Sequence, residues 1–286
     1  MTTLAELNSG SKVAFVMALG DVFEQSPWVA EAVASQRPFA SLNALYEALA
    51  KALRGAEPAK QKELIQAHPD LAGKAAKAGT LTADSTAEQA AAGLDRLSDA
   101  EYAAFHRLND SYRVKFGMPF IVCVRRHTKD SILREFERRV GNDPAQETQT
   151  ALTEILRIAA LRLDQKVTAD DKLPLAGRIT THVLDTSSGK PAAGIPVELF
   201  EVAADGTARF IARAVTNADG RTDAPLIGGR PVPIGSYELR FDVGAYFGPD
   251  AFLGLVPIRF KVAEAESHYH VPLLASPWGY TTYRGS

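Results

Sequence analysis

Side chains suited to proton transfer and anion binding fall in two separate parts of the chain. In the first part, His68 precedes Pro69, and proline disfavours the α conformation of the residue before it. His68 is therefore expected at the end of a helix, where its ring can point into a cleft. Imidazole is the side chain best suited to donate and accept protons near neutral pH. A surface histidine at a turn is the alternative interpretation.

A second candidate lies in the stretch STAEQ, where Ser85 and Glu88 have the spacing of a capping box. In that role both side chains would satisfy backbone N–H groups at the start of a helix. A helix N-terminus is also a favourable anion site, so both uses can coexist if Glu88 turns toward a ligand. Ser98 and Glu101 predict another capping box.

The other part of the chain carries three histidines and an arginine that could act together. In a strand, His182 shares a face with Thr180, and His268 shares a face with His270. Three interpretations are open from the spacing. The histidines form hydrogen bonds on a sheet face, or they bind zinc, or they combine with Arg221 in a metal-free acid–base site.

The elements that would position these residues differ between the two parts. Residues 1–166 contain 8 of the 21 glycines and residues 167–286 contain 13. Leu152, Leu156 and Leu163 recur at helical spacing, whereas apolar residues alternate with polar ones in 237–243 and 258–262. We therefore expect two domains, an all-α, helical bundle-like N-terminal domain followed by an all-β sandwich with antiparallel strands.

The domain boundary is expected in the polar stretch DQKVTADDK, which lacks an apolar period. The predicted organisation is a helical domain over 1–166, a linker over 167–176 and a β domain over 177–286. Gly117 and Pro119 are expected to end a helix, and Pro144 to begin the last helix of the first domain. Residues 217–220 predict a turn between strands.

Composition excludes several classes of protein. Lys and Arg total 32 and Asp and Glu total 34, so no strong attraction to nucleic acid or to an anionic membrane is expected. A lone cysteine, Cys123, excludes an intrachain disulfide and a cysteine zinc cluster. No apolar run is long enough to span a bilayer, and neither end resembles a secretory or peroxisomal signal. A cytoplasmic location is the default expectation.

The motifs of residues 8–166, taken together, resemble 2-oxo-4-hydroxy-4-carboxy-5-ureidoimidazoline (OHCU) decarboxylase. They are SPWVA, RPF, HPDLAGK, STAEQ and LN..Y..KFG.PFI. The resemblance implies an all-helical domain that needs no cofactor. It implies that His68 is the catalytic histidine, supported by Glu88, and that an arginine of the last helix holds the substrate anion. The implied substrate contacts are Pro69, Ser85, Gln89 and the segment Phe120, Ile121, Val122, Cys123 and Val124.

Two arginines of the last predicted helix could fill the family's arginine position. At 100° per residue, Arg157 points away from the apolar stripe, whereas Arg162 lies on its flank and can reach a cleft. The family's alignment also favours Arg162. We therefore expect Arg162 rather than Arg157 in the site.

Residues 178–286 resemble 5-hydroxyisourate hydrolase, the enzymatic relative of transthyretin. The matching motifs are THVLDTSSGKPAAGIPVELF, TNADGR, HYHVPLL and the terminal YRGS. By resemblance the catalytic residues are His182, Arg221, His270 and Ser286, and Tyr283 contacts the substrate. His268 is expected to support them, and no metal is implied. The family's sites form between subunits of a tetramer.

The two resemblances together imply a bifunctional enzyme of urate breakdown. The second domain would hydrolyse 5-hydroxyisourate to OHCU, and the first would decarboxylate OHCU to (S)-allantoin. The expected partners are these two small molecules and further copies of the chain, as a tetramer through the C-terminal domain with possible N-terminal dimer contacts. A transthyretin-like carrier with a helical docking domain, or a chain with only one activity, are the alternatives.

Overall fold

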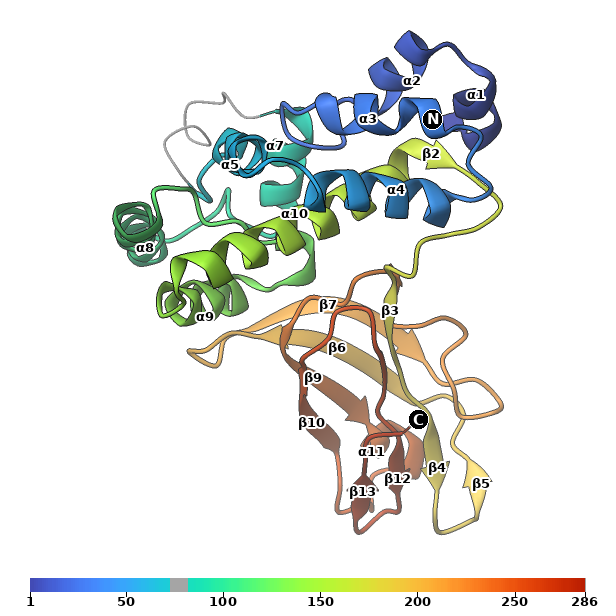
Figure 1. Cartoon of the computed structure of the whole chain (residues 1–286). Helices are drawn as coiled ribbons and strands as arrows, with labels where there is room; N and C mark the ends of the chain where they lie inside the picture. Colours follow the sequence, from blue (N-terminus) through green and yellow to red (C-terminus); the bar gives the residue numbers. More distant parts are fainter. Residues whose placement is uncertain (73–81, 286) are drawn as a thin grey trace. The chain divides into compact units, whose positions relative to one another are not determined.

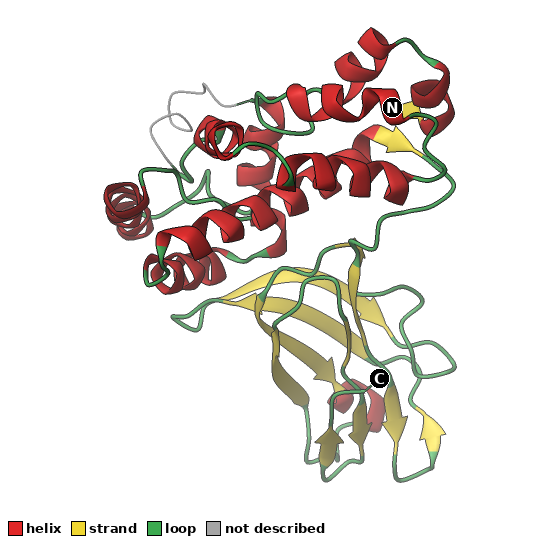
Figure 2. Ribbon diagram, viewed as in Figure 1, coloured by secondary structure: helices red, strands yellow, loops and turns green. Residues whose placement is uncertain are grey.

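The computed structural model describes residues 1–72 and 82–285, which form two compact units (Figure 1). The first unit comprises Met1–Val124 and Ile132–Pro174, and the second comprises Arg125–Ser131 and Leu175–Ser286. Helices dominate the first unit and strands the second, as Figure 2 shows. The predicted fold class, helical followed by all-β, is confirmed.

The first unit is built from helices around the long helix α10. The helices are α1 Leu4–Ser9, α2 Lys12–Leu19, α3 Trp28–Val33, α4 Leu42–Arg54, α5 Pro58–Ala67, α7 Ala83–Ala91, α8 Asp99–Phe116, α9 Lys129–Val140 and α10 Pro144–Lys166. Asp143 caps α10 and Pro144 begins it, as predicted. Leu152, Leu156 and Leu163 are at most 2% exposed, so their stripe faces the core.

Two predicted helix ends are confirmed and a third is wrong. Ser98 and Glu101 form the capping box of α8, and Gly117 ends that helix with φ of +65°. The capping box expected at Ser85 does not exist, because α7 starts earlier and its cap is Thr82. The Thr82 hydroxyl accepts a hydrogen bond from the Ser85 N–H. Ser85 and Glu88 therefore lie inside the helix, with their side chains free for another role.

The predicted connector is attached to the first unit rather than extended between domains. Its first residues, Val167–Thr168 (β2), pair in parallel with Thr2–Thr3 (β1). The Asp171 carboxylate accepts hydrogen bonds from the backbone N–H groups of Leu42 and Asn43 at the start of α4. These contacts extend the first compact unit to Pro174.

The second unit contains a four-stranded antiparallel sheet and two mixed sheets of three and four shorter strands. The antiparallel sheet has the order β10-β9-β6-β7, and the mixed sheets have the orders β11-β3-β8 and β13-β12-β4-β5. The strands are β3 Gly177–Thr180, β4 Val183–Asp185, β5 Lys190–Pro191, β6 Pro196–Val202, β7 Ala208–Val215, β8 Ile227–Arg230, β9 Gly235–Asp242, β10 Leu255–Val262, β11 His268–His270, β12 Leu273–Ala275 and β13 Tyr280–Thr282.

The predicted alternation is confirmed by burial at the apolar positions, whereas Glu238, predicted to face outward, is also buried. Tyr237, Leu239 and Phe241 of β9 are fully buried in the core of the second unit, together with residues of β6 and β10. Each such side chain removed from water contributes about 1.5–3 kcal/mol. The strand predicted over 237–243 ends one residue earlier, because Asp242 caps the short helix α11, Val243–Phe247.

The segment Arg125–Ser131 packs with the second unit although its neighbours in sequence belong to the first. The Arg126 guanidinium forms two hydrogen bonds with the Glu266 carboxylate, at 2.6 and 2.7 Å. The Thr128 N–H and hydroxyl both donate to the carbonyl of Ile234. Among residues 1–72 and 82–285, no helix is long and apolar enough to cross a membrane.

Candidate active sites

His68 occupies the position that its proline neighbour predicts. It is the residue after α5, its backbone is extended, and its side chain is only 7% exposed. The alternative of a surface histidine is therefore wrong. Its Nδ1 lies 2.9 Å from the carbonyl oxygen of Leu64. Because a carbonyl only accepts, Nδ1 carries the proton of the neutral ring and Nε2 presents a lone pair.

Burial lowers the pKa of His68 to about 4, against an opposing effect of the hydrogen bond to Leu64 and the charge of Glu24. The ring is therefore neutral at physiological pH. A buried neutral imidazole with one free lone pair is equipped to take up a proton. Burial removes the water that would stabilise the protonated ring. Protonation of His68 therefore depends on the charges that the protein places beside it.

Arg162 of α10 is the centre of a buried charge cluster beside this histidine. Its guanidinium forms a fork with Glu88, through Nε and Nη2 at 2.9 and 2.8 Å. Nη1 donates to Glu24 at 2.9 Å, and Nη2 donates to the Ser85 hydroxyl at 3.3 Å. Arg162 is 3% exposed, whereas the side chain of Arg157 is 43% exposed and pairs with Glu154. The structure thus brings together Arg162, Ser85 and Glu88.

Glu24 is a member of this cluster that the sequence analysis missed. It is 3% exposed and accepts hydrogen bonds from Thr82 at 2.8 Å and from Ser85 at 3.1 Å. Burial alone would raise its pKa, but the Thr82 hydrogen bond and the charge of Arg162 outweigh burial and lower it. The only signal in the sequence is that Glu24 directly follows the apolar pair Val22 and Phe23, and Asp21 nearby offers the same signal.

The charges of the cluster differ from what was expected. Glu88 was expected to support His68, but its carboxylate is bound to Arg162 instead. The carboxylate whose charge acts on His68 is that of Glu24. Two carboxylates against one guanidinium leave a net charge of minus one beside a neutral imidazole.

Gln89 holds the bend that follows Pro69. Its Oε1 accepts from the N–H of Ala72, which has an unusual positive φ of +51°. From the other side, Asn109 of α8 donates to the carbonyl of Leu71 at 2.9 Å. Both contacts keep the backbone after His68 in one conformation.

The predicted lining segment, Phe120 to Val124, is buried throughout. Two of its backbone groups contact side chains of the core. The Ile121 carbonyl accepts from Arg139 at 2.7 Å, and the Cys123 N–H donates to Glu154 at 2.8 Å. Its contact with a substrate stays a prediction.

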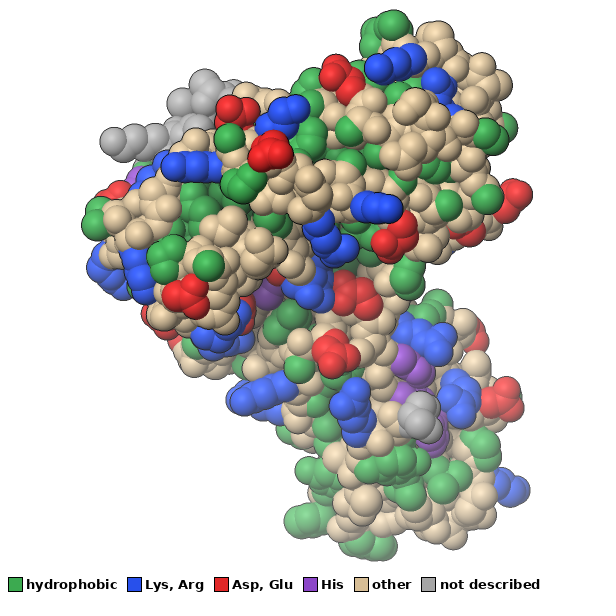
Figure 3. All heavy atoms as spheres, viewed as in Figure 1, with side chains coloured by type: hydrophobic (Ala, Val, Ile, Leu, Met, Phe, Trp, Pro, Cys, Tyr) green, Lys and Arg blue, Asp and Glu red, His purple; other side chains and the backbone are tan. Residues whose placement is uncertain are grey.

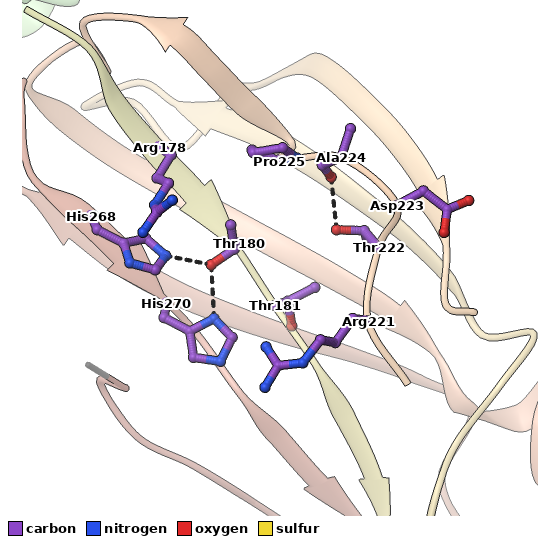
Figure 4. Close-up of a pocket in the computed structure, with 10 residues that line it drawn as sticks. All are labelled: Arg178, Thr180, Thr181, Arg221, Thr222, Asp223, Ala224, Pro225, His268 and His270. Carbon is purple, nitrogen blue, oxygen red and sulfur yellow. Dashed lines mark hydrogen bonds between the residues drawn. The ribbon is translucent and has the colours of Figure 1, made fainter. Parts of the chain in front are cut away.

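In the second unit, strand pairing brings the histidines together. β11 runs parallel to β3, with His268 opposite Arg178 and His270 opposite Thr180. The Thr180 hydroxyl lies 2.6 Å from His268 Nε2 and 2.8 Å from His270 Nδ1, as Figure 4 shows. His270 Nε2 in turn lies 2.7 Å from His182 Nδ1. Four side chains therefore form one continuous hydrogen-bonded chain.

The predicted turn places Arg221 beside these four hydrogen-bonded side chains. Gly220 has φ of +69°, and the N–H of Gly220 donates to the carbonyl of Asn217. A β-bridge then aligns the backbone of Arg221 with that of His182. In Figure 4 the Arg221 side chain extends toward His270.

A pocket of about 310 Å³ lies over these residues. It is lined by Arg178, Thr180, Thr181, Arg221, Thr222, Asp223, Ala224, Pro225, His268 and His270 (Figure 4). His182 and Tyr283 are absent from this lining, and Tyr283 is 53% exposed. On the surface, histidine side chains gather next to Lys and Arg side chains (Figure 3).

The chain terminus packs directly on His270. The N–H of Gly285 donates to the His270 carbonyl at 2.9 Å. A Cβ at position 285 would lie 2.5 Å from Cδ2 of the His270 ring, so only glycine fits. Ser286, predicted as catalytic, lies outside the described residues, which end one position before it.

Two family models match the chain, one over each unit. The OHCU decarboxylase model covers residues 8–164, and the HIUase/Transthyretin family model covers residues 179–285. The chain belongs to both families. The predicted resemblance to each of them is confirmed.

Individual relatives agree with this assignment. OHCU decarboxylase of Halalkalicoccus jeotgali is 45% identical over 57% of this chain and 90% of its own length. 5-Hydroxyisourate hydrolase 2 of Rhizobium meliloti is 55% identical over 39% of this chain and 98% of its own length. A crystal structure of (S)-allantoin synthase is 33% identical, covers 100% of both chains and has a TM-score of 0.56.

The hydrolase-family site consists of neutral histidines beside cationic arginines. Burial and the charge of His182, followed by that of Arg221, lower the pKa of His270 to about 4. Burial and nearby arginines also lower the pKa of His182 and of His268. Both nitrogens of His270 are engaged with Thr180 and His182. The neutral ring has a single ring-nitrogen lone pair, and it faces Thr180 or His182 rather than a point shared with the other histidines, which favours the metal-free interpretation over zinc.

Proposed function

We propose that this chain carries out two consecutive steps of urate breakdown. The second unit hydrolyses 5-hydroxyisourate to OHCU, and the first unit decarboxylates OHCU to (S)-allantoin. The observation that carries the proposal is that both polar clusters are assembled on one chain, which matches an (S)-allantoin synthase structure along its whole length.

Hydrolysis of 5-hydroxyisourate requires water to attack a ring carbonyl. A C–O bond forms, the ring C–N bond breaks, and the departing nitrogen takes a proton. The lowered pKa of each histidine in this site keeps its ring neutral at physiological pH, so a ring nitrogen has a lone pair that can accept the proton of the water. Arg221 stays protonated, so its role is to stabilise negative charge on the substrate oxygen.

Decarboxylation of OHCU breaks the bond between the ring and its carboxylate. The electron pair passes into the electron-poor ring, CO₂ leaves, and one carbon receives a proton on a single face. The ring itself accepts the electrons, so the residues need only bind, orient and move the proton. His68, with its free Nε2, is suited to the proton transfer.

Arg162 is suited to hold the anionic substrate, because Glu24 and Glu88 fix the position of its guanidinium. A guanidinium has five N–H groups, and Glu88, Glu24 and Ser85 engage four of them. The fifth can donate to the substrate carboxylate. Because the cluster already carries a net negative charge, we expect an anionic substrate to bind together with a proton, with tighter binding at lower pH.

We also propose that the chain assembles into a homo-oligomer through its second unit. Phe252, Leu255 and Trp278 are large apolar side chains that are 58–77% exposed in the single chain. Where such side chains adjoin one another, the apolar patch that they form favours association. The tetrameric state, the N-terminal dimer contacts and the cytoplasmic location stay predictions.

The proposal is tested by supplying 5-hydroxyisourate, made from urate with urate oxidase, to the purified chain. Ultraviolet absorbance follows loss of 5-hydroxyisourate, and circular dichroism follows formation of dextrorotatory allantoin. Acceleration of both signals is expected. Loss of 5-hydroxyisourate at the spontaneous rate would remove the hydrolase assignment, and formation of racemic allantoin would remove the decarboxylase assignment.

A further inference from the structure

The hydrogen-bonded chain in the second unit includes two residues without a clear role in the reaction, Thr180 and His268. Resemblance assigns only support to His268. Yet the Thr180 hydroxyl contacts His268 Nε2 at 2.6 Å and His270 Nδ1 at 2.8 Å. These are short hydrogen bonds, and they join His268 to the pair of His270 and His182.

His270 lies in the interior of this chain. Its Nδ1 faces Thr180 and its Nε2 faces His182, so neither nitrogen is available to a water molecule. A proton can enter or leave only at the two ends, His182 Nε2 and His268 Nδ1. His268 lines the pocket, so its end of the chain is the one next to a ligand bound there.

The Thr180 hydroxyl determines which ring nitrogens carry protons, because it has a single proton to donate. If it donates to His268, it accepts from His270 Nδ1–H. His270 Nε2 then accepts from His182 Nδ1–H, which leaves a lone pair on His182 Nε2. If Thr180 donates to His270 instead, every proton shifts by one bond, and the lone pair appears on His268 Nδ1.

We propose that Thr180 and His268 take part in hydrolysis, with Thr180 as a positioning residue that passes a proton between His268 and the pair of His182 and His270. This inference rests on the proposed hydrolase function. The oxygen of water bonds to the ring carbonyl carbon, and its proton goes to His268 Nδ1, the end of the hydrogen-bonded chain that lines the pocket. The protons of the hydrogen-bonded chain shift by one bond, and His182 Nε2–H releases a proton to solvent. The reverse shift returns a proton to His268 Nδ1, which protonates the departing nitrogen as the C–N bond breaks.

The charges around the chain favour such a transfer over a fixed positive charge. Arg178 on β3 and Arg221 after the turn face the histidines, with Asp223 in the same pocket and Glu266 in the neighbouring one. The two arginines disfavour an imidazolium at any single ring. Moving the proton through the chain, rather than storing it, avoids that cost.

The test uses the full-length enzyme with Thr180→Val, which removes the hydroxyl and keeps the shape. General acid–base groups contribute about 10²–10⁴-fold, so we expect kcat for hydrolysis to fall at least about ten-fold, with KM changed less than about two-fold. Thr180→Ser should restore most of kcat. His268→Gln, which keeps a hydrogen bond but cannot titrate, should resemble Thr180→Val.

The number of protons that move in the rate-determining step can be measured independently of kcat and KM in the variants. In mixtures of H₂O and D₂O, the wild-type rate should curve with deuterium fraction, whereas the Thr180→Val rate should vary linearly. Thr186→Val is the matched control, since it removes a threonine hydroxyl of the second unit that donates to the backbone carbonyl of Ala275, at 3.1 Å, and contacts no histidine of the site. Decarboxylation of supplied OHCU by Thr180→Val should be unchanged, because Thr180 lies in the second unit, and an unchanged thermal unfolding transition of that unit shows that the variant is folded.

Two results would overturn the inference. One is hydrolysis by Thr180→Val within two-fold of the wild type, and the other is equal impairment of Thr180→Ser and Thr180→Val. Both require an active wild-type enzyme. If the wild type itself does not accelerate loss of 5-hydroxyisourate, the proposed function fails instead.

Discussion

The two sites of this chain handle charge in opposite ways. In the helical unit, Arg162 is buried between Glu24 and Glu88, and the cluster carries a net negative charge. In the β unit, neutral histidines are joined by hydrogen bonds at a pocket that Arg178 and Arg221 make positive. The first site depends on buried ion pairs, and the second on the orientation of neutral rings.

This difference follows from the elements that hold the residues. Residues on α7 and α10 are brought into a protein interior, where an unpaired charge is costly, so every charge there has a partner. β3 and β11 place their polar face toward an open pocket, where water and hydrogen bonds satisfy the polar groups without ion pairs. We therefore expect removal of a charge to lower the stability of the first site strongly. In the second site, we expect removal of a hydrogen bond or a change of shape to lower the rate of hydrolysis strongly.

The largest expected effect is loss of one activity with retention of the other. His68→Ala should lower decarboxylation by about 10²–10⁴-fold, because it removes the proton-transfer group, and leave hydrolysis intact. His270→Ala should do the reverse when OHCU is supplied. Separate assays of the two steps measure this. Loss of both activities in either variant would show that the sites are not independent.

Arg162→Met should destabilise the helical unit by about 3–5 kcal/mol, since it leaves the buried Glu24 and the partly buried Glu88 without their cation. Denaturant unfolding followed by far-ultraviolet circular dichroism measures the change. Arg138→Met in α9 is the control, because Arg138 pairs with Glu135 on the surface, where the two side chains are 58% and 32% exposed, and its loss should cost less than about 1 kcal/mol. Equal costs for the two variants would contradict the buried ion-pair account.

A change of shape should act selectively on the β site. Gly285→Ala places a Cβ 2.5 Å from the His270 ring, which hydrogen bonds hold on both nitrogens, so hydrolysis should fall about ten-fold. Gly279→Ala has open space around its Cβ and should leave hydrolysis unchanged. If both variants hydrolyse at the wild-type rate, the terminus does not set the position of His270.

The smallest expected effect concerns pH. Because burial lowers the pKa of His68 to about 4, the unfolded chain binds more protons than the folded one between about pH 4 and 6.5. The stability of the helical unit should therefore be greatest above pH 6.5 and decline as pH falls toward 4. His68→Asn should lose less free energy of unfolding between pH 7 and 5 than the wild type. Parallel curves for the two would show that His68 titrates normally.

Local rules predicted much of the fold and part of the sites. The rule for the residue before proline placed His68 at the end of α5, and the helical period chose Arg162 over Arg157. The capping rule failed at Ser85, because Thr82 offers an equivalent cap three residues earlier. When two caps compete, tertiary contacts decide, and here Glu24 binds both hydroxyls.

The remaining site residues depend on contacts between segments far apart in sequence. Glu24 meets Arg162 across 138 positions, and Thr180 meets His268 across 88. No local spacing encodes such a contact. The requirement for glycine at position 285 is of the same kind, because it arises only from the close contact with the ring of His270.

The most direct test of two consecutive steps on one chain combines the two single-site variants. His68→Ala should convert 5-hydroxyisourate to OHCU but form no dextrorotatory allantoin above the spontaneous rate, and His270→Ala alone should not accelerate loss of 5-hydroxyisourate. A mixture of the two variants should restore formation of dextrorotatory allantoin from 5-hydroxyisourate, measured by circular dichroism. Formation of dextrorotatory allantoin by His68→Ala alone at the wild-type rate would contradict the assignment of one step to each unit.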